Sequence, residues 1–422
     1  MHQQEEPFSN FEKHPNDETC KGVNRLHVAL LSHEYPPFIF GGVGTFAENL
    51  AHGLLRRGVE VTVIAGYPVP SGGFKKYKVD KQQTDSGINI VRFPYPNTSP
   101  RQLWFQIFNL PKISEVIRRS NPDVIHGQSG STFPSSYVLK DLAPWITTFH
   151  TSPKTEKTLS TQSLLRGGSR SDFLTYLVGY PVWHITFKKE LQYSNAAIAV
   201  SRALKSELLE EMGERYKDKT RFIHNGVDIQ SLDKEYEQAG TDILESEKAI
   251  LFAGRLFWRK GPLNMIRLAY LLQKKKTNFT IIMHGTGPLA NRMQEYIRSL
   301  GLKNITFKGF TTRSQLMKSM RYCKFVAIPS MYEACPMILL ESMCLGKIPL
   351  MLKLPFSSEL TEDGKYGILA EGVESLTDKL ITLTNTTSLN QLSNDIRKFA
   401  RNVYNLDKVT SKYIEMYRNV TS

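Results

Sequence analysis

Cysteine is scarce in this chain of 422 residues, and long apolar runs are absent. The four cysteines, Cys20, Cys323, Cys335 and Cys344, match no paired CxxC spacing of a zinc site, and so few of them are typical of a reducing compartment. No apolar run reaches the ~18 residues that a membrane-spanning helix needs. The start, MHQQEEPFSN, has neither the basic stretch nor the apolar core of a secretion signal. These absences exclude a disulfide scaffold and an integral membrane protein, and they predict a cytoplasmic location.

Acidic residues are fewer than basic ones, 40 against 54, which gives a net charge of +14. Residues 1–24 run against this balance, because they hold five acids and two lysines and lack periodicity. We therefore predict a disordered acidic tail over 1–24. The basic remainder suits anionic partners such as phosphorylated small molecules or an acidic membrane face. Nucleic acid is not expected, because no zinc-finger spacing or RNA-binding signature occurs.

Apolar strand-like segments alternate with helical ones along the rest of the chain, which predicts α/β architecture with parallel sheets. Residues 25–230 form a first predicted domain, and residues 248–405 form a second. The polar, acidic segment 231–247 between them is the predicted linker. A final amphipathic helix over 406–420 could pack on either domain. Ligands of open parallel sheets bind beyond the carboxyl ends of the strands, so two such domains would face each other across a cleft.

A glycine-rich loop, 36–44, follows the first strand and enters a helix over 43–57. Glycine lets a backbone approach a ligand closely, and a helix N-terminus favours an anion. The run 42–47 formally fits a dinucleotide GxGxxA pattern, but the second strand ends in Gly66 and Tyr67 rather than in an acid that would grip a ribose. An ordinary helix-entry turn therefore remains an equal alternative for this loop.

Two further segments follow predicted strands of the second domain. In 254–261, Arg255 and Lys260 lie five residues apart across a strand-to-helix turn, where two cations can neutralise a diphosphate. In 329–341, Glu333 falls in a loop and Glu341 in a helix that starts with a proline. Carboxylates suit sugar hydroxyls, and the free amides of a helix N-terminus suit a phosphate.

These segments together resemble the retaining family 4 glycosyltransferases of GT-B fold, with two Rossmann-like domains facing across a cleft. The resemblance is carried by GRLFWRKG, HGTGP and PSMYEACPMILLESMCLGKIPL in the second domain. In the first domain it is carried by YPPFIFGGVGTFAENLAHGLLRRGVEVTVIAG, PDVIHGQ, TTFHT, AIAVS and IHNGVD. It runs from about residue 26 to the C-terminus, and it implies that the helix 406–422 packs back on the first domain.

The resemblance implies a role for each matching position. Arg255 and Lys260 would hold the diphosphate of a nucleotide-sugar, Glu333 would contact the donor sugar, and Glu341 would contact the ribose. His150, in TTFHT, would line the donor sugar near the reacting carbon. Two glycines, Gly41 and Gly42, would approach the donor from the first domain. Three other histidines near strand ends are weaker candidates, namely His126, His224 and His284.

The chain departs from the family where a Gly-Phe-Gly-like run often follows the first glutamate. Here the sequence is Ala334-Cys335-Pro336, and proline has no N–H to donate. Met337 and Ile338 would then supply the backbone donors, while Cys335 is interpreted as a small packing residue. No Asp-x-Asp occurs in the chain, so we predict a metal-independent transferase that uses no cofactor beyond its nucleotide-sugar co-substrate.

Three other interpretations remain: a nucleotide-sugar epimerase, a non-catalytic sugar-nucleotide binding protein, and a dinucleotide oxidoreductase. The acceptor is open between a lipid-linked glycan, a lipid, a polysaccharide and a small molecule. Residues 101–110, RQLWFQIFNL, would place a wide apolar arc on a helix, with Lys112, Arg118 and Arg119 following. That composition is typical of an interfacial helix, which would place the enzyme on the anionic inner face of a membrane. The alternative is that the arc packs into the first domain or lines the acceptor cleft.

Overall fold

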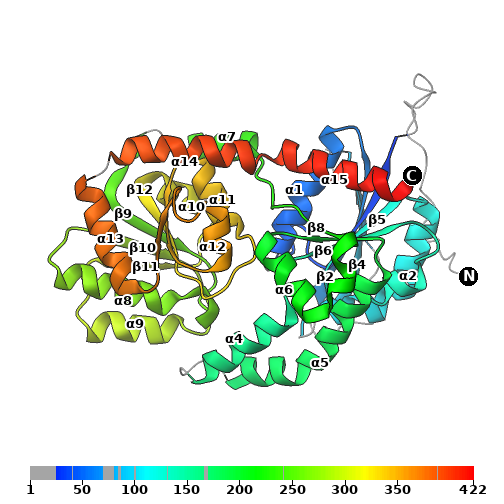
Figure 1. Ribbon diagram of the computed structural model, residues 1–422, viewed down its shortest axis with the longest axis horizontal. Helices are drawn as coiled ribbons and strands as arrows, with labels where there is room; N and C mark the ends of the chain where they lie inside the picture. Colours follow the sequence, from blue (N-terminus) through cyan, green and yellow to red (C-terminus); the bar gives the residue numbers. More distant parts are fainter. Residues whose placement is uncertain are drawn as a thin grey trace, which may run out of the picture. The chain divides into compact units, whose positions relative to one another are not determined.

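The computed structural model describes residues 25–39, 41–69, 80–83, 87–98, 101–130, 132–165, 170–240, 242–386 and 388–422. The predicted disordered tail, 1–24, lies outside the described residues. Strands alternate with helices along the chain and form two sheets (Figure 1). The architecture is therefore α/β, as the alternation of strand and helix patterns predicts.

One sheet has eight strands in the order β3-β4-β2-β1-β5-β6-β7-β8. The strands are β1 (His27–Ser32), β2 (Glu60–Val69), β3 (Asp80–Gln83), β4 (Asn89–Pro96), β5 (Val124–Gln128), β6 (Trp145–Phe149), β7 (Ala196–Ala199) and β8 (Thr220–Phe222). The central strand β1 pairs in parallel with β2 and β5, and every residue of β1 is buried. The edge strand β3 is antiparallel to β4.

The other sheet has six strands in the order β11-β10-β9-β12-β13-β14. They are β9 (Ser246–Ala253), β10 (Thr280–His284), β11 (Ile305–Gly309), β12 (Cys323–Ile328), β13 (Ile348–Leu352) and β14 (Ile368–Ala370). All five neighbouring pairs are parallel. The strand order reverses between β9 and β12, and such a switch point is where open parallel sheets bind ligands.

The first helices along the chain are α1 (Gly42–Arg56), α2 (Arg101–Ser120), α3 (Ser135–Val138), α4 (Pro153–Leu165), α5 (Arg170–Tyr193), α6 (Arg202–Met212), η2 (Glu214–Lys219) and α7 (Ile229–Gln238). They are followed by η3 (Trp258–Lys260), α8 (Pro262–Lys274), α9 (Ala290–Ser299), α10 (Arg313–Tyr322), α11 (Met337–Cys344), α12 (Pro355–Leu360), α13 (Val373–Thr386), α14 (Leu389–Val403) and α15 (Leu406–Thr421). In Figure 1, α8 and α9 lie along one side of the six-stranded sheet, and α7 and α14 lie along the other.

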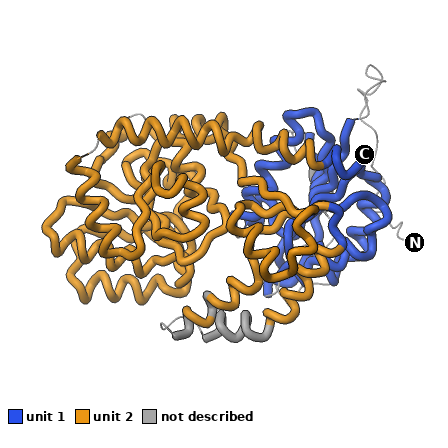
Figure 2. The backbone as a smooth tube through the Cα atoms, viewed as in Figure 1, with its two compact units in different colours: residues 1–147, 193–195, 417–422 blue, residues 148–192, 196–416 orange. Residues whose placement is uncertain are grey.

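The chain forms two compact units (Figure 2). Unit 1 comprises Met1–Thr147, Tyr193–Asn195 and Tyr417–Ser422, and unit 2 comprises Thr148–Gln192 and Ala196–Met416. The predicted linker, 231–247, contains most of α7 and the first residues of β9. Helix α7 forms there because the Asp228 side chain caps it, accepting from the Ser231 N–H. The predicted domain boundaries at 25–230 and 248–405 remain a prediction.

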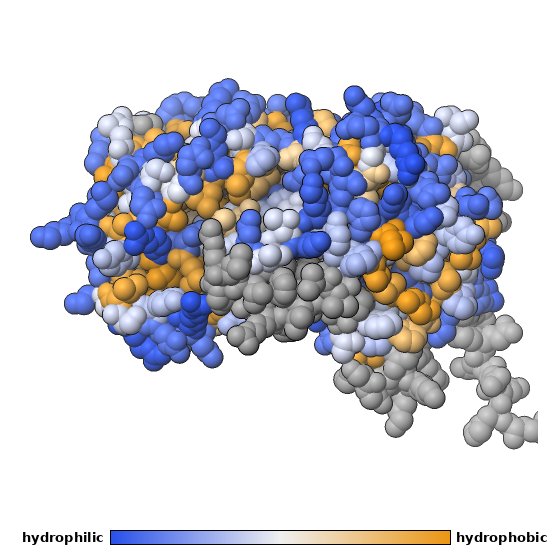
Figure 3. Space-filling view, turned by 60° about the horizontal axis from the view of Figure 1, so that its bottom comes forward, coloured by the Kyte–Doolittle hydropathy of each residue, from blue (hydrophilic) through white to orange (hydrophobic). Residues whose placement is uncertain are grey.

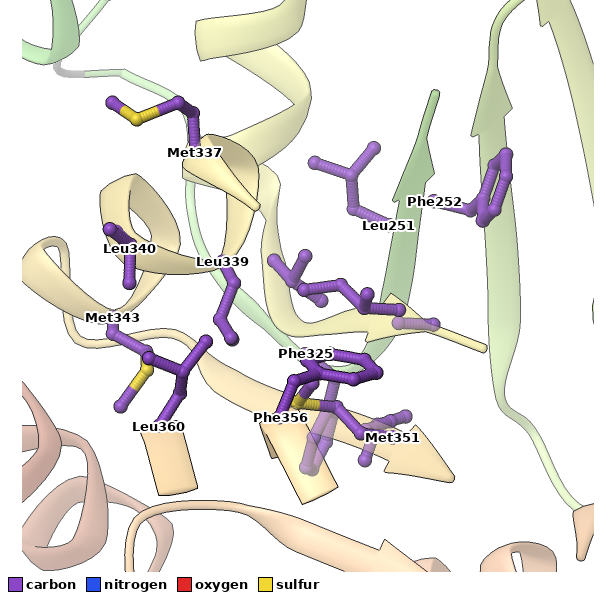
Figure 4. Packing of buried hydrophobic residues seen from close by; sticks show 14 of the residues in the cluster. Leu251, Phe252, Phe325, Met337, Leu339, Leu340, Met343, Met351, Phe356 and Leu360 are labelled. Carbon is purple, nitrogen blue, oxygen red and sulfur yellow. The ribbon is translucent and has the colours of Figure 1, made fainter. Parts of the chain in front are cut away.

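The hydrophobic core around the six-stranded sheet fixes α11 in place. Leu339, Leu340 and Met343 of α11 belong to one buried cluster with Phe325 of β12 and Leu360 of α12 (Figure 4). Burying a side chain of this size stabilises the fold by about 1.5–3 kcal/mol. Because α11 is buried along most of its length, its N-terminus is held firmly beside the end of β12.

The C-terminal helix α15 buries one face. Leu406, Val409, Tyr413 and Tyr417 are almost completely buried, whereas Met416 and Val420 are half-buried. Tyr417, and not the neighbouring Met416, completes the buried face. The Tyr417 hydroxyl lies 2.7 Å from Nδ1 of His126, so the end of α15 contacts β5.

Candidate functional site

Two of the predicted motifs meet at the switch point between β9 and β12. Segment 254–261 follows β9, and segment 329–336 follows β12. The N–H of Met331 donates to the carbonyl oxygen of Arg259 over 2.8 Å, and the side-chain amide of Asn264 donates to the carbonyl oxygen of Pro329 over 3.0 Å. These bonds join the two segments into one site.

Gly261 explains why the segments can approach so closely. Its φ of +66° lies in the left-handed region, and a Cβ there would be 1.9 Å from the carbonyl oxygen of Pro329. Any side chain would therefore clash with backbone as well as strain the turn. The glycine ends the turn η3 and begins α8 immediately after Lys260.

An ion pair lies at the centre of this site. Nζ of Lys260 is 2.5 Å from Oε1 of Glu333, which also accepts a hydrogen bond of 2.9 Å from the Ser330 hydroxyl. The two charged side chains are 25% and 11% exposed, so solvent screens the pair only in part. The structure thus brings together two residues that the sequence places 73 positions apart.

Arg255 lies beside this pair in sequence and is exposed. Its guanidinium stacks over the ring of Phe257, 4.4 Å from the ring centre. The backbone around it is held by the HGTGP loop, since the N–H of Leu256 donates to the carbonyl oxygen of Thr286 over 2.8 Å. A Cβ on Gly287 would lie 2.8 Å from the Leu256 backbone, so this loop also requires a glycine.

The start of α11 supplies backbone donors next to Glu333. Pro336 is its N-cap residue, and Met337 is its first helical residue, one position later than the sequence predicts. No side chain caps this helix. The N–H groups of Met337 and Ile338 precede that of Leu339, which is the first to donate to the Pro336 carbonyl, so they are oriented to bind an anion.

Glu341 has a partner that the sequence does not reveal. Its carboxylate is 6% exposed and lies 2.7 Å from Nη1 of Arg313, whose Nε lies 2.8 Å from Glu235. Burial lowers the pKa of Arg313, but Glu341 and Glu235 outweigh burial and raise it, so the guanidinium stays charged. Arg313 begins α10 just beyond β11, and its place after a parallel strand is the signal that could have found it.

The remaining predicted residues follow two strands of the eight-stranded sheet, β1 and β6. His150 is half-buried and follows β6 in unit 2. Gly41 and Gly42 belong to unit 1, at the start of α1, where the N–H of Gly41 donates to the Glu34 carboxylate over 3.0 Å. Among the described residues, nothing lies within 4 Å of a Cβ built on either glycine, so local packing does not require them to be glycine.

The weaker histidine candidates have structural partners. Besides His126 with Tyr417, Nε2 of His284 lies 2.7 Å from the Ser319 hydroxyl, and Nε2 of His224 lies 2.7 Å from the Glu359 carboxylate. Cys335 is also buried, and burial raises the pKa of its thiol to about 12. A thiol held in this neutral form fits the packing role that the sequence suggests.

Comparisons with known proteins agree with this architecture. The model described as "Glycosyltransferase Family 4" matches residues 40–231, and the model described as "Glycosyl transferases group 1" matches residues 233–403. An uncharacterized glycosyltransferase of Methanocaldococcus jannaschii is 27% identical over 341 residues, which are 76% of this chain and 79% of that protein.

Solved structures show the same fold. Sucrose-phosphate synthase from Thermosynechococcus elongatus matches with a TM-score of 0.74 and 16% identity, over 94% of this chain and 99% of that one. Anabaena HepE, solved in complex with UDP-glucose, matches with a TM-score of 0.65 and 18% identity, over 94% of this chain and 100% of that one. The two Rossmann-like sheets thus define a GT-B fold, which confirms the predicted fold class. The chain belongs to the group 1 and family 4 type of glycosyltransferases and is an enzyme of the transferase class.

Proposed function

We propose that this glycosyltransferase moves a sugar from a nucleotide-diphosphate-sugar to an acceptor hydroxyl, with retention of the anomeric configuration. The observation that carries the proposal is the Lys260–Glu333 pair at the switch point, next to the uncapped start of α11. A cation, a carboxylate and free N–H groups suit a diphosphate joined to a sugar. The Anabaena structure with UDP-glucose supports a donor of this class.

Each site residue then has a role. Arg255, Lys260 and the N–H groups of Met337 and Ile338 bind the diphosphate. Glu333 binds hydroxyls of the donor sugar, and Glu341, oriented by Arg313, binds the ribose. His150 lines the donor sugar near the reacting carbon, and Gly41 and Gly42 are the glycines proposed to bind the donor.

The reaction breaks the bond between the anomeric carbon and the diphosphate oxygen, and it forms a bond from that carbon to the acceptor oxygen. The acceptor proton passes to the leaving phosphate, so the products are the glycoside and a nucleoside diphosphate. Fixed cations and helix amides stabilise the charge on the leaving group, which is the electrostatic role that often dominates such rates. The proposal assigns no step to a metal ion.

A thermal-shift screen tests the donor class, using UDP, GDP, ADP and their glucose or mannose conjugates. A ligand present at a hundred times its Kd adds about 2.7 kcal/mol to the stability of the folded state. We expect one nucleotide family to raise the melting temperature, while the corresponding nucleoside without phosphate does not. A panel in which no nucleotide raises it would contradict the proposal.

An epimerase and a non-catalytic binding protein remain the alternatives. An epimerase would convert the donor to an isomeric nucleotide-sugar in the absence of an acceptor. Chromatographic separation of the two isomers after incubation therefore distinguishes an epimerase from a transferase. The melting temperature of a non-catalytic binding protein would rise in the thermal screen, but the protein would release no nucleoside diphosphate. The charged set of Arg255, Lys260, Glu333 and Glu341 favours the transferase.

We further propose that unit 1 contacts an anionic membrane and that the acceptor is lipid-linked. The predicted helix forms as α2, but its apolar arc divides: Phe105 is buried in the core, whereas Ile107 and Phe108 are 48% and 45% exposed. Helix α3 contributes Tyr137 and Val138, also about half exposed, and Gln106 binds Ser135 to join the two helices. On the face in Figure 3, hydrophobic residues gather in separate areas among hydrophilic ones.

Liposome sedimentation tests this contact. No helix among the described residues is long and apolar enough to cross a membrane. Each basic residue near an anionic leaflet adds about 1 kcal/mol, so Lys112, Arg118 and Arg119 would favour anionic vesicles. Ile107→Ser with Phe108→Ser should weaken binding, whereas Leu300→Ser, an equally exposed residue of unit 2, should not. No binding to anionic vesicles at low salt would contradict the membrane contact and would leave a soluble acceptor.

A further inference from the structure

Two glutamates outside the proposed donor site contact the loops that carry Lys260 and Glu333. Glu156 of α4 forms an ion pair with Nη1 of Arg259, the residue before Lys260. Glu207 of α6 accepts a hydrogen bond of 3.0 Å from the hydroxyl of Tyr332, the residue before Glu333. Each carboxylate therefore contacts a residue that directly precedes a member of the central ion pair in the sequence.

Both glutamates are also held from their other side. The Thr151 hydroxyl donates to Oε1 of Glu156 over 2.9 Å, and the Thr155 hydroxyl donates to Oε2 of Glu207 over 3.0 Å. The side chain of Glu156 is only 12% exposed. Hydrogen bonds with a charged partner and little solvent are stronger than ordinary ones, so these contacts fix geometry as well as join the segments.

Glu156 belongs to the segment that follows His150, and Glu207 of α6 is joined to that segment by the hydrogen bond from Thr155. Thr151 comes next in the chain, and α4 begins two residues later with Pro153. A cavity of about 180 Å³ lies here, lined by Ser152, Lys154, Thr155, Thr158, Glu207, Glu210, Met331 and Tyr332. Tyr332 and Glu207 therefore meet at the edge of this cavity. Side-chain packing is incomplete there, so the hydrogen bond between them helps to fix the loop 329–333.

Burial affects the titration of this contact. It raises the pKa of the Glu207 carboxyl, although hydrogen bonds from Tyr332, Thr155 and Ser152 act in the opposite direction. Burial also raises the pKa of Tyr332, so its hydroxyl stays a donor. The contact therefore persists as a hydroxyl-to-carboxyl hydrogen bond.

We propose that Glu207 and Glu156 are positioning residues, which hold the loops 258–261 and 329–333 so that Lys260 and Glu333 remain aligned for the donor. The proposal rests on the proposed function, because it concerns the same donor site. Neither glutamate touches the donor in this assignment, and each acts through its loop neighbour. Because the Met331 N–H already joins the two loops, the glutamates orient the two loops together relative to α4 and α6.

Tyr332→Phe and Glu207→Leu test the proposal, with Glu207→Gln as the conservative variant. Both disruptive variants should lower kcat about tenfold to a hundredfold, as expected when reacting groups shift by about 1 Å, with the donor KM nearly unchanged. Glu207→Gln keeps an oxygen acceptor for Tyr332 and should restore most of the rate. Glu210→Gln removes a carboxylate from the same cavity and should behave as the wild type, since Glu210 pairs with the exposed Lys154.

Hydrogen–deuterium exchange measures the local stability of the two loops in the same variants, and it needs no substrate. Loss of one ordinary hydrogen bond corresponds to about tenfold faster exchange, which we expect in peptides covering 254–261 and 329–336. If Glu207→Leu fails to fold, Tyr332→Phe removes only a hydroxyl and decides alone. Exchange and kcat equal to those of Glu210→Gln would overturn the proposal. A wild-type enzyme that turns over no nucleotide-sugar would refute the proposed function instead, and the exchange of the two loops would still decide the positioning role.

Discussion

Replacing Lys260 with alanine removes the cation of the central ion pair. Its Nζ lies 2.5 Å from Glu333, and in the proposed reaction it also faces the leaving diphosphate. Losing one preorganised group that stabilises developing charge typically costs about 10²–10³ in rate. We therefore expect Lys260→Ala to lower kcat by about that factor.

The cost to stability should be much smaller than the cost to rate. The side chains of the pair are 25% and 11% exposed, which is intermediate between a surface pair and a buried pair. Loss of a surface pair costs about 0–1 kcal/mol of folding free energy, and breaking a buried pair costs about 3–5 kcal/mol. We therefore expect Lys260→Ala to cost about 1–2 kcal/mol. The remaining carboxylate keeps the hydrogen bond from Ser330. The variant should therefore fold, with a melting temperature a few degrees lower.

The assay measures nucleoside diphosphate release at saturating donor alongside thermal unfolding. Lys275→Ala is the matched control, because Lys275 pairs with Asp378 at 3.0 Å on an exposed surface. Adding Glu333→Ala to Lys260→Ala should cost less than the sum of the two single effects, since residues in contact are not additive. A folded Lys260→Ala enzyme with unchanged kcat/KM would refute the diphosphate role.

Three further results are expected. Glu341→Ala should weaken binding of nucleotide and nucleotide-sugar alike in calorimetry; an effect confined to the nucleotide-sugar would exchange the roles of the two site glutamates. Activity should survive excess EDTA, and a loss that Mg²⁺ or Mn²⁺ restores would reveal a metal requirement. Burial would raise the pKa of Glu359 above its ordinary 4.5, but hydrogen bonds from His224, Arg202 and Ala203 outweigh it and lower that pKa. The ionised Glu359 carboxylate therefore stabilises the fold above pH 4.5, and this stabilisation is lost as pH falls through the lowered pKa. Acidification should lower the melting temperature of the wild type more than that of Glu359→Gln. Equal decreases in the two proteins would argue against this linkage.

Much of the fold could be predicted because its buried strands are apolar and its turns carry glycine. The predicted helix over 43–57 corresponds to α1, and both of its boundaries are met within a residue. The edge strand β3, Asp80–Gln83, is polar and pairs antiparallel with β4, so no apolar pattern marks it in the sequence.

The candidate site was predictable where residues follow neighbouring strands of the sheet, and less so where they follow strands further apart. Lys260 and Glu333 follow β9 and β12, so the switch point brings them together. The partner of Glu341 was missed because Arg313 follows a different strand, β11. Glu207 carries no sequence signal at all: it lies on the amphipathic helix α6, and only the folded chain places Tyr332 against it.

The anomeric configuration of the product tests the central claim most directly. The enzyme is incubated with the donor identified in the thermal screen and with a lipid-linked or soluble acceptor, and the glycoside is followed by proton NMR while nucleoside diphosphate is quantified. The account predicts one nucleoside diphosphate per glycoside formed, with the product keeping the anomeric configuration of the donor. A product of inverted configuration, or an epimerised nucleotide-sugar formed without acceptor, would contradict it.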